Sequence, residues 1–152
     1  MPKFLEIFQI DAFTSEPFCG NPAAVVLDDF LTETEMKSIA AEMNLSETAF
    51  LSSSDKADFN LRWFTPKTEV NLCGHATIAS LHFLFEKNLL RENSEITFNT
   101  KSGIINAGKT NDSYWMQIPK IEFIKNDTDL SELFSALGLK SSAVNKNVFD
   151  GT

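Results

Sequence analysis

Apolar residues along this chain follow a two-residue period in some stretches and a helical period in others. Runs with the two-residue period, or with continuous β-branched and aromatic residues between turn signals, predict strands. Gly20-Asn21-Pro22 and Asn111-Asp112 have typical turn chemistry and separate such runs. The predicted strands are residues 3–13, 23–27, 46–52, 58–65, 95–100, 103–109 and 113–118.

Three stretches predict helices. Thr32, followed by Glu33 and Glu35, is a capped and dipole-matched start for an amphipathic helix that ends near Asn44. Residues 74–87 are apolar around nearly the whole helix circumference, which only an enclosed helix can satisfy. A short helix is predicted for 129–137, with Gly138 at its end.

Taken together, these elements predict an α+β fold in a single domain over residues 1–152. The strands would form a curved, mostly antiparallel sheet wrapped around the central buried helix 74–87. A chain of 152 residues with fourteen Phe is large enough to bury a substantial core.

Charge and cysteine content narrow the possible partners. The formal charge of −8 disfavours nucleic acid and anionic membranes, which need a basic surface. The start of the chain lacks the apolar run of a signal sequence and no stretch is apolar enough to span a membrane, so we expect a cytoplasmic protein. We therefore expect Cys19 and Cys73 to be reduced thiols.

Cys73, Gly74 and His75 stand where the central helix should begin. The unpaired amides there suit an anion such as a small carboxylate, and Gly74 would let it approach closely; alternatively, Gly74 only caps the helix. The helix dipole would lower the pKa of the Cys73 thiol and make it a candidate acid or base, although most free cysteines are small buried hydrophobes. No metal site is expected, because His75 and His82 lie seven residues apart, too far for both to bind one ion. His82 is expected to be a satisfied core or boundary residue.

Glu47 opens the apolar run Ala49-Phe50-Leu51, where a solvated surface would not normally begin. Desolvation there would raise the pKa of the Glu47 carboxyl group toward neutrality, which suits a general base that removes a carbon-bound proton. The alternative is that Glu47 has only a turn or capping role. Arg62 and Glu69 are expected to form a salt bridge of the scaffold, without a chemical role.

Three motifs occur in order: "DAFTSEPFCGNPAAVVL", "IAAEMNLSETAFL" and "LRWFTPKTEVNLCGHATIAS", with an "SGII" strand after them. They resemble the PhzF-like isomerases of phenazine biosynthesis over roughly residues 5–118. The resemblance implies the diaminopimelate-epimerase-like fold, in which two similar domains each wrap a sheet around a helix and enclose the active site between them.

The resemblance also implies proton transfer at carbon of a small amino or hydroxy acid, without a cofactor. Glu47, in the "NLSET" motif, would shuttle the proton, while Gly74 and His75 would bind and polarise the substrate. In the more distant proline-racemase relatives a Cys in a "CGH" context is a base, so Cys73 is a second candidate. The substrate's identity stays open.

The family continues into a further domain that residues 1–152 do not contain, so the chain corresponds to the N-terminal half. Isomerase activity would then need a complementary second half or a second copy of the chain, which predicts association, as a homo-oligomer for instance. The alternative is a non-catalytic module that binds small carboxylates or a partner.

Overall fold

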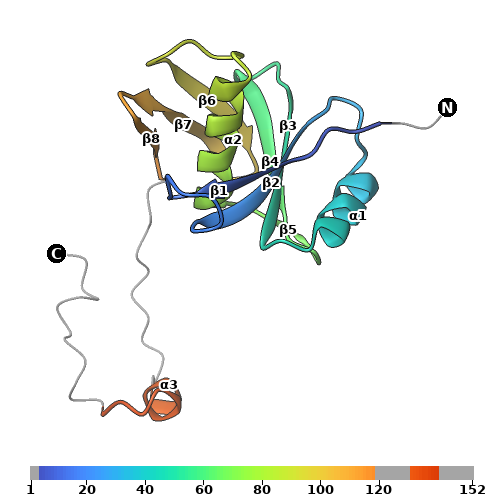
Figure 1. The fold of residues 1–152 in the computed structure, drawn as a ribbon. Helices are drawn as coiled ribbons and strands as arrows, with labels where there is room; N and C mark the ends of the chain where they lie inside the picture. Colours follow the sequence, from blue (N-terminus) through green and yellow to red (C-terminus); the bar gives the residue numbers. More distant parts are fainter. Residues whose placement is uncertain (1–3, 119–130, 141–152) are drawn as a thin grey trace. The chain divides into compact units, whose positions relative to one another are not determined.

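The structure of the protein, a computed structural model, describes residues 4–118 and 131–140. The chain divides into two units, Met1–Pro119 and Lys120–Thr152. Within the described residues of the first unit, two helices and the strands of one sheet follow one another along the chain (Figure 1). They are β1 (Phe8–Ala12), β2 (Asn21–Leu27), α1 (Glu33–Met43), β3 (Glu47–Ser53), β4 (Phe59–Phe64), β5 (Glu69–Val70), α2 (Gly74–Glu86), β6 (Glu95–Thr100), β7 (Gly103–Thr110) and β8 (Ser113–Met116).

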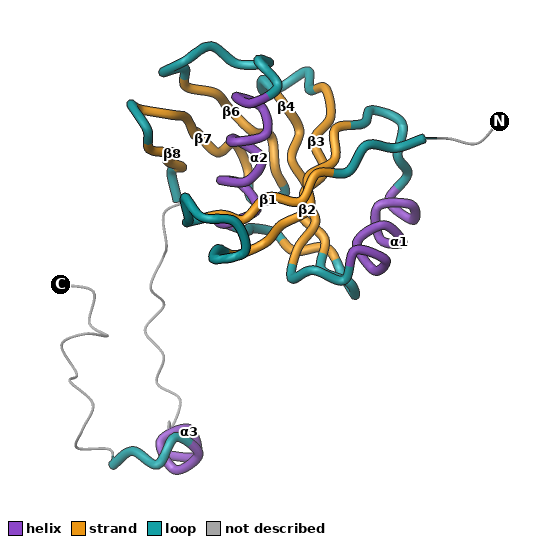
Figure 2. The backbone as a smooth tube through the Cα atoms, in the orientation of Figure 1, coloured by secondary structure: helices purple, strands orange, loops and turns teal. Residues whose placement is uncertain are grey.

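The strands form one mixed sheet in the order β1-β2-β3-β4-β6-β7-β8, with β5 paired to β4. The pairs β2–β3 and β4–β6 are parallel, and the other neighbours are antiparallel. The sheet curls around α2, as Figure 2 shows, and α2 contacts β1, β2 and β3 toward one end of the sheet and β7 and β8 at the other. The predicted α+β fold with a curved, mostly antiparallel sheet around one buried helix is confirmed.

Helix α2 fits inside the sheet because its side chains are small or apolar on almost every face. Ala76 and Ala79 are fully buried beside larger apolar side chains of the same helix. Two hydroxyls also lie in this core: Thr77 Oγ1 donates to the carbonyl of Cys73 at 2.6 Å, and Ser80 Oγ donates to that of Ala76 at 2.8 Å. These bonds satisfy the hydroxyls within the helix, so α2 carries no unpaired side-chain hydroxyl into the core.

Helix α1 packs on the other face of the sheet, against β3 and β4. Thr32 and Glu35 form the expected start as a reciprocal capping box, and the helix ends at Asn44 in the left-handed conformation (φ 51°). Its buried residues, Met36 and Ala40, share a small second core with the outward-facing apolar residues of the sheet. The sheet is therefore covered on both faces near β3 and β4.

The predicted elements agree with the structure except at some ends. The first strand is shorter than the predicted 3–13: the described residues 4–7 are not paired, and Phe4 is almost fully exposed. The hairpin β3–β4 and the meander β6-β7-β8 are confirmed. In the second unit, α3 (Ser131–Ala136) confirms the short helix and Gly138 follows it at φ 65°, while residues 129–130 lie outside the described range.

Among the described residues, no helix is both long and apolar enough to cross a membrane. Cys19 is exposed and Cys73 is buried, and both are free thiols, as expected. The single domain over residues 1–152 stays a prediction.

Candidate active site

Glu47 is the first residue of β3, and the strand directs its side chain toward the inner face of the sheet. Side chains alternate along a strand, so Glu47 shares its face with Ala49 and Leu51. Both of those belong to the core around α2. Because Glu47 stands at the open end of this row, its side chain keeps 20% of its surface exposed. The carboxylate therefore lies at the edge of the core, between apolar packing and solvent.

The N-terminus of α2 lies opposite this carboxylate. Cys73 precedes the helix in an extended conformation, and no side chain caps the helix start. Gly74 is exposed, and apart from its chain neighbours and the backbone of its own helix no heavy atom lies within 4 Å of the position that a Cβ would take there. The space in front of the first turn is thus open on the side of Gly74, where a small ligand could approach the helix start.

His75 connects the two elements through both of its ring nitrogens. Its Nε2 lies 3.5 Å from Oε2 of Glu47 and 3.3 Å from Oγ of Ser46, which precedes β3. Its Nδ1 lies 3.4 Å from Sγ of Cys73. The imidazole keeps only 11% of its surface exposed. Glu47, Cys73, Gly74 and His75, named from the sequence, are thereby brought to one place.

The predicted direction of the Cys73 shift is wrong. Burial above all, together with the nearby Glu47 carboxylate, raises the pKa of the Cys73 thiol to about 11, although the backbone amides of Ala76 and His75 act to lower it. The amides at the helix start do act as expected, but the loss of hydration outweighs them. The thiol is therefore protonated at neutral pH.

Glu47, Cys73 and His75 are also the one group of three potential metal ligands in the described part of the chain, with one donor atom from each lying within 4.8 Å of the others. However, the thiol faces Nδ1 whereas the carboxylate faces Nε2 of the same ring. A single ion can bind only one nitrogen of an imidazole. The thiol is hydrogen-bonded to one nitrogen of the ring and the carboxylate has an ion-pair contact with the other, an arrangement that does not resemble a preformed ligand shell.

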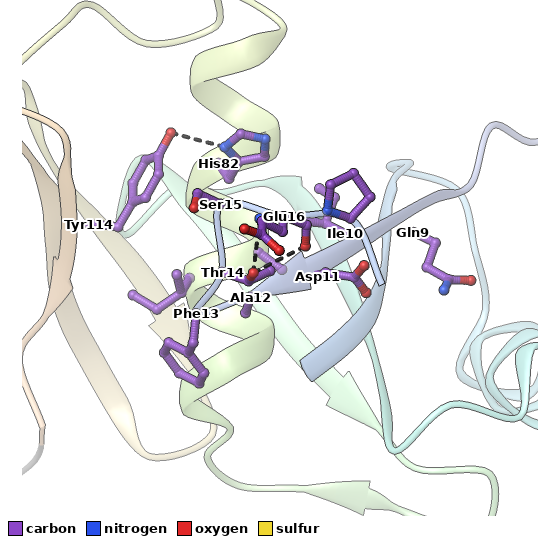
Figure 3. Close-up of a pocket in the computed structure, with 13 residues that line it drawn as sticks. Gln9, Ile10, Asp11, Ala12, Phe13, Thr14, Ser15, Glu16, His82 and Tyr114 are labelled. Carbon is purple, nitrogen blue, oxygen red and sulfur yellow. Dashed lines mark hydrogen bonds between the residues drawn. The ribbon is translucent and has the colours of Figure 1, made fainter. Parts of the chain in front are cut away.

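A cavity of about 420 Å³ lies elsewhere, between the turn that follows β1 and the middle of α2 (Figure 3). Asp11, Thr14 and Glu16 line it on one side, and His82 and Tyr114 lie at its other side. His82 Nδ1 is 3.1 Å from the Tyr114 hydroxyl, which confirms His82 as a satisfied residue at the core boundary. None of the residues around this cavity belongs to the Glu47 and His75 group, so size alone does not identify the site.

The predicted scaffold salt bridge is present on the outer face of the sheet. Arg62 makes two bonds of 2.7 Å to the carboxylate of Glu69 and one of 2.8 Å to Glu33 of α1. Lys101 also pairs with Glu69, whose side chain is only 6% exposed.

Ser46 is the site residue that sequence reasoning missed. The signal was present, since Ser46 directly precedes Glu47 in the "NLSET" motif. Its contact with His75 joins residues 29 positions apart, so no local pattern contains it.

Comparison with known proteins gives consistent matches. The family model described as "Phenazine biosynthesis-like protein" matches residues 10–149. An uncharacterised isomerase of Halalkalibacterium halodurans is 45% identical over 145 residues, which cover 95% of this chain and 54% of that protein. The crystal structure of a PhzF-family phenazine biosynthesis protein from Enterococcus faecalis is 39% identical with a TM-score of 0.74, over 90% of this chain and 52% of the other.

A hydroxyproline epimerase from Agrobacterium vitis shares the fold at 10% identity, with a TM-score of 0.55 over 70% of this chain and 38% of that one. The chain spans about half the length of the curated relatives and solved structures that it matches.

Proposed function

Since the chain belongs to the phenazine biosynthesis-like family of isomerases, we propose that it contributes one wall of the active site of a cofactor-independent isomerase. In this proposal Glu47 is the acid and base, and it moves a proton between carbons of a small amino or hydroxy acid. The observation that carries the proposal is the 3.5 Å approach of the Glu47 carboxylate to His75 at the open start of α2. It joins a base to a site that can hold an anion.

Each residue then has a distinct part in the reaction. The substrate carboxylate binds in the open space beside Gly74, where the exposed helix start attracts negative charge. Glu47 removes the proton from the substrate carbon and returns it at another position or on the other face. The charge that develops on the substrate is stabilised by the imidazole of His75 and the helix start.

Glu47 is a better candidate for the base than Cys73. A thiol with a pKa of about 11 is almost entirely protonated at neutral pH, so it has little thiolate to accept a proton. The carboxyl group of Glu47 lies at the edge of the core, where it is still reachable from solvent. Cys73 is therefore proposed to act on His75 and not on the substrate.

The experiment is isotope exchange in deuterium oxide. The full chain is incubated with a panel of small amino acids and 2-hydroxy acids, and deuterium incorporation at carbon is followed by proton NMR and mass spectrometry. Glu47→Gln should lower the exchange rate by about a hundredfold or more, the usual contribution of a general base. Glu42→Gln removes an exposed glutamate of α1 and is the matched control, which should exchange at the native rate. If native protein catalyses exchange and Glu47→Gln catalyses it at the same rate, the role of Glu47 is overturned.

A second candidate function is a non-catalytic module that binds small carboxylates. It is favoured by one observation, namely that the chain spans about half the length of its relatives. In the isomerase proposal the opposite wall of the site comes from a complementary half or a second copy. Calorimetric titration with the same panel separates the binding module from an isomerase that a second copy of the chain completes. Binding without isotope exchange, at chain concentrations at which copies associate, selects the binding module.

A further inference from the structure

We propose that Cys73 is a positioning residue: its thiol donates a hydrogen bond to Nδ1 of His75 and so holds the ring in the tautomer with its proton on Nε2, toward Glu47. The catalytic consequence rests on the function proposed above. The tautomer itself can be measured without any substrate.

The argument starts from what the neighbours of the ring can donate and accept. A neutral imidazole has one N–H donor and one bare nitrogen that accepts. An ionised carboxylate only accepts, so the approach of Glu47 Oε2 to Nε2 at 3.5 Å favours a proton on Nε2. Nδ1 is then the acceptor, and the neighbour that it meets is the sulfur of Cys73 at 3.4 Å.

Cys73 is able to supply the proton that Nδ1 needs. Its side chain is buried in the core around α2, where burial and the negative charge of Glu47 both keep the thiol neutral. A thiol is a weak donor, and its sulfur is a weak acceptor, so the S–H group suits a bare ring nitrogen better than an N–H group. The thiol also has a side-chain hydrogen-bond contact with the Glu47 carboxylate, so this carboxylate and Nδ1 are alternative acceptors for its proton. The thiol serves Nδ1 when the ring carries its own proton on Nε2.

Ser46 is the neighbour that could reverse this assignment. Its hydroxyl lies 3.3 Å from Nε2, and it would select the opposite tautomer if it donated to that nitrogen. A hydroxyl rotates to donate or accept as needed, whereas the carboxylate beside it cannot donate. Ser46 can therefore accept from Nε2–H together with Glu47, and the carboxylate decides the direction.

The tautomer has a consequence for the proposed base. With the proton on Nε2, the ring donates toward Oε2 of Glu47 and restricts the orientation of the carboxylate, which leaves its other lone pairs for the substrate. With the proton on Nδ1, the bare Nε2 would face the carboxylate without a hydrogen bond. Cys73 thus acts on Glu47 indirectly: it fixes the tautomer of His75, and the His75 ring orients the carboxylate of the proposed base.

The experiment is long-range proton–nitrogen NMR of the full chain labelled with nitrogen-15 in histidine. The chain contains only two histidines, so the ring signals of His75 and His82 are readily separated. In native protein at neutral pH, His75 should show the pattern of a proton on Nε2. Cys73→Ala should shift the ratio of tautomers toward Nδ1–H by about fivefold, the usual effect of one hydrogen bond, and Cys73→Ser should restore the native ratio.

His82 serves as an internal control, because its contact with Tyr114 lies two helical turns from Cys73. Unchanged His82 signals show that α2 and β8 still pack in the variant. Ser46→Ala should keep the proton on Nε2. A proton on Nδ1 in native protein, protonation of both nitrogens, or an identical ratio in native protein and Cys73→Ala would each overturn the proposal.

If Cys73→Ala fails to fold, Cys73→Val, which replaces the thiol by an apolar side chain of similar size, should give the same shift toward Nδ1–H, and an unchanged ratio in that variant would overturn the proposal. The result is also separable from the proposed function. A proton on Nε2 that depends on Cys73, in a chain whose isotope exchange does not depend on Glu47, would support the positioning role while removing the isomerase mechanism.

Discussion

Two groups of ionisable side chains lie on opposite faces of the sheet, and they differ in how completely their partners satisfy them. On the outer face, Arg62 holds Glu69 through two bonds of 2.7 Å and reaches Glu33 at 2.8 Å. On the inner face, the contacts of His75 with Glu47 and Cys73 are 3.5 and 3.4 Å long. The outer group is a closed network, whereas the inner group has capacity left to bind a further group.

The outer group therefore has the properties of a structural network, and the inner group has those of a reactive site. Short bidentate contacts to a nearly buried carboxylate are characteristic of a structural ion pair, because removing one partner leaves a buried charge without compensation. Longer contacts beside the open start of a helix cost little to rearrange, and so suit groups that must exchange protons. We expect substitutions in the outer group to change stability and substitutions in the inner group to change chemistry.

Arg62→Met should give the largest loss of stability. It leaves Glu69, with a side chain only 6% exposed, dependent on Lys101 alone. The free energy of unfolding should fall by about 2 to 4 kcal/mol, as when one partner of a largely buried ion pair is removed. Urea unfolding at pH 7 measures it. A loss below about 0.5 kcal/mol would show that the Arg62 network does not stabilise the fold, and would contradict the expected difference between the two faces of the sheet.

The fold was predictable from sequence to the extent that it depends on local periodicity. The all-round apolar pattern of residues 74–87 could only belong to an enclosed helix, and Thr32 with Glu35 marked the start of α1. The first strand was predicted too long because alternation shows which residues could pair, and not where the neighbouring strand ends. Phe8 pairs with Val25, and the described residues before Phe8 have no such partner.

Most residues of the candidate site could be predicted from the sequence, but the pKa shift of Cys73 and the contact of Ser46 could not. Ordered motifs named Glu47, Cys73, Gly74 and His75, and the structure brings them together. The sign of the Cys73 pKa shift could not be predicted, since the local sequence shows a helix start but not how deeply the sulfur is buried. The contact of Ser46 with His75 depends on packing between distant segments, which local patterns do not contain.

Alkaline pH should reveal the buried thiol of Cys73. Its pKa is raised from an ordinary value near 9 to about 11, so its contribution to stability is complete below pH 9 and is lost as the pH rises to 11. Native protein should therefore lose about 2 kcal/mol more than Cys73→Ala over this interval. Urea unfolding of both proteins at several pH values measures the difference. The contributions of the other groups that titrate in this interval are common to both proteins and cancel in the comparison. Parallel curves would contradict the burial of the thiol.

Lys101→Met should have a smaller effect than Arg62→Met, although both residues pair with Glu69. The Lys101 side chain is half exposed, and Arg62 still holds the carboxylate through two bonds. The expected loss is about 0.5 to 1 kcal/mol, the usual contribution of an exposed ion pair. Urea unfolding at low and high salt measures it, since salt should reduce this loss more than that of Arg62→Met. If Lys101→Met costs more than Arg62→Met, the order of importance within the network is reversed.

Glu47→Gln should have the smallest effect on stability of these four substitutions. Glutamine has the same shape, its carbonyl oxygen can still accept from Nε2 of His75, and the 3.5 Å contact that it replaces is long and weak. The free energy of unfolding should change by no more than about 0.5 kcal/mol, as measured in urea at pH 7. A loss above about 1.5 kcal/mol would make the pair of Glu47 and His75 a structural contact like that of Arg62 and Glu69. A small change, together with a large loss of isotope exchange, would assign Glu47 to the chemistry, because the variant would then be folded and inactive.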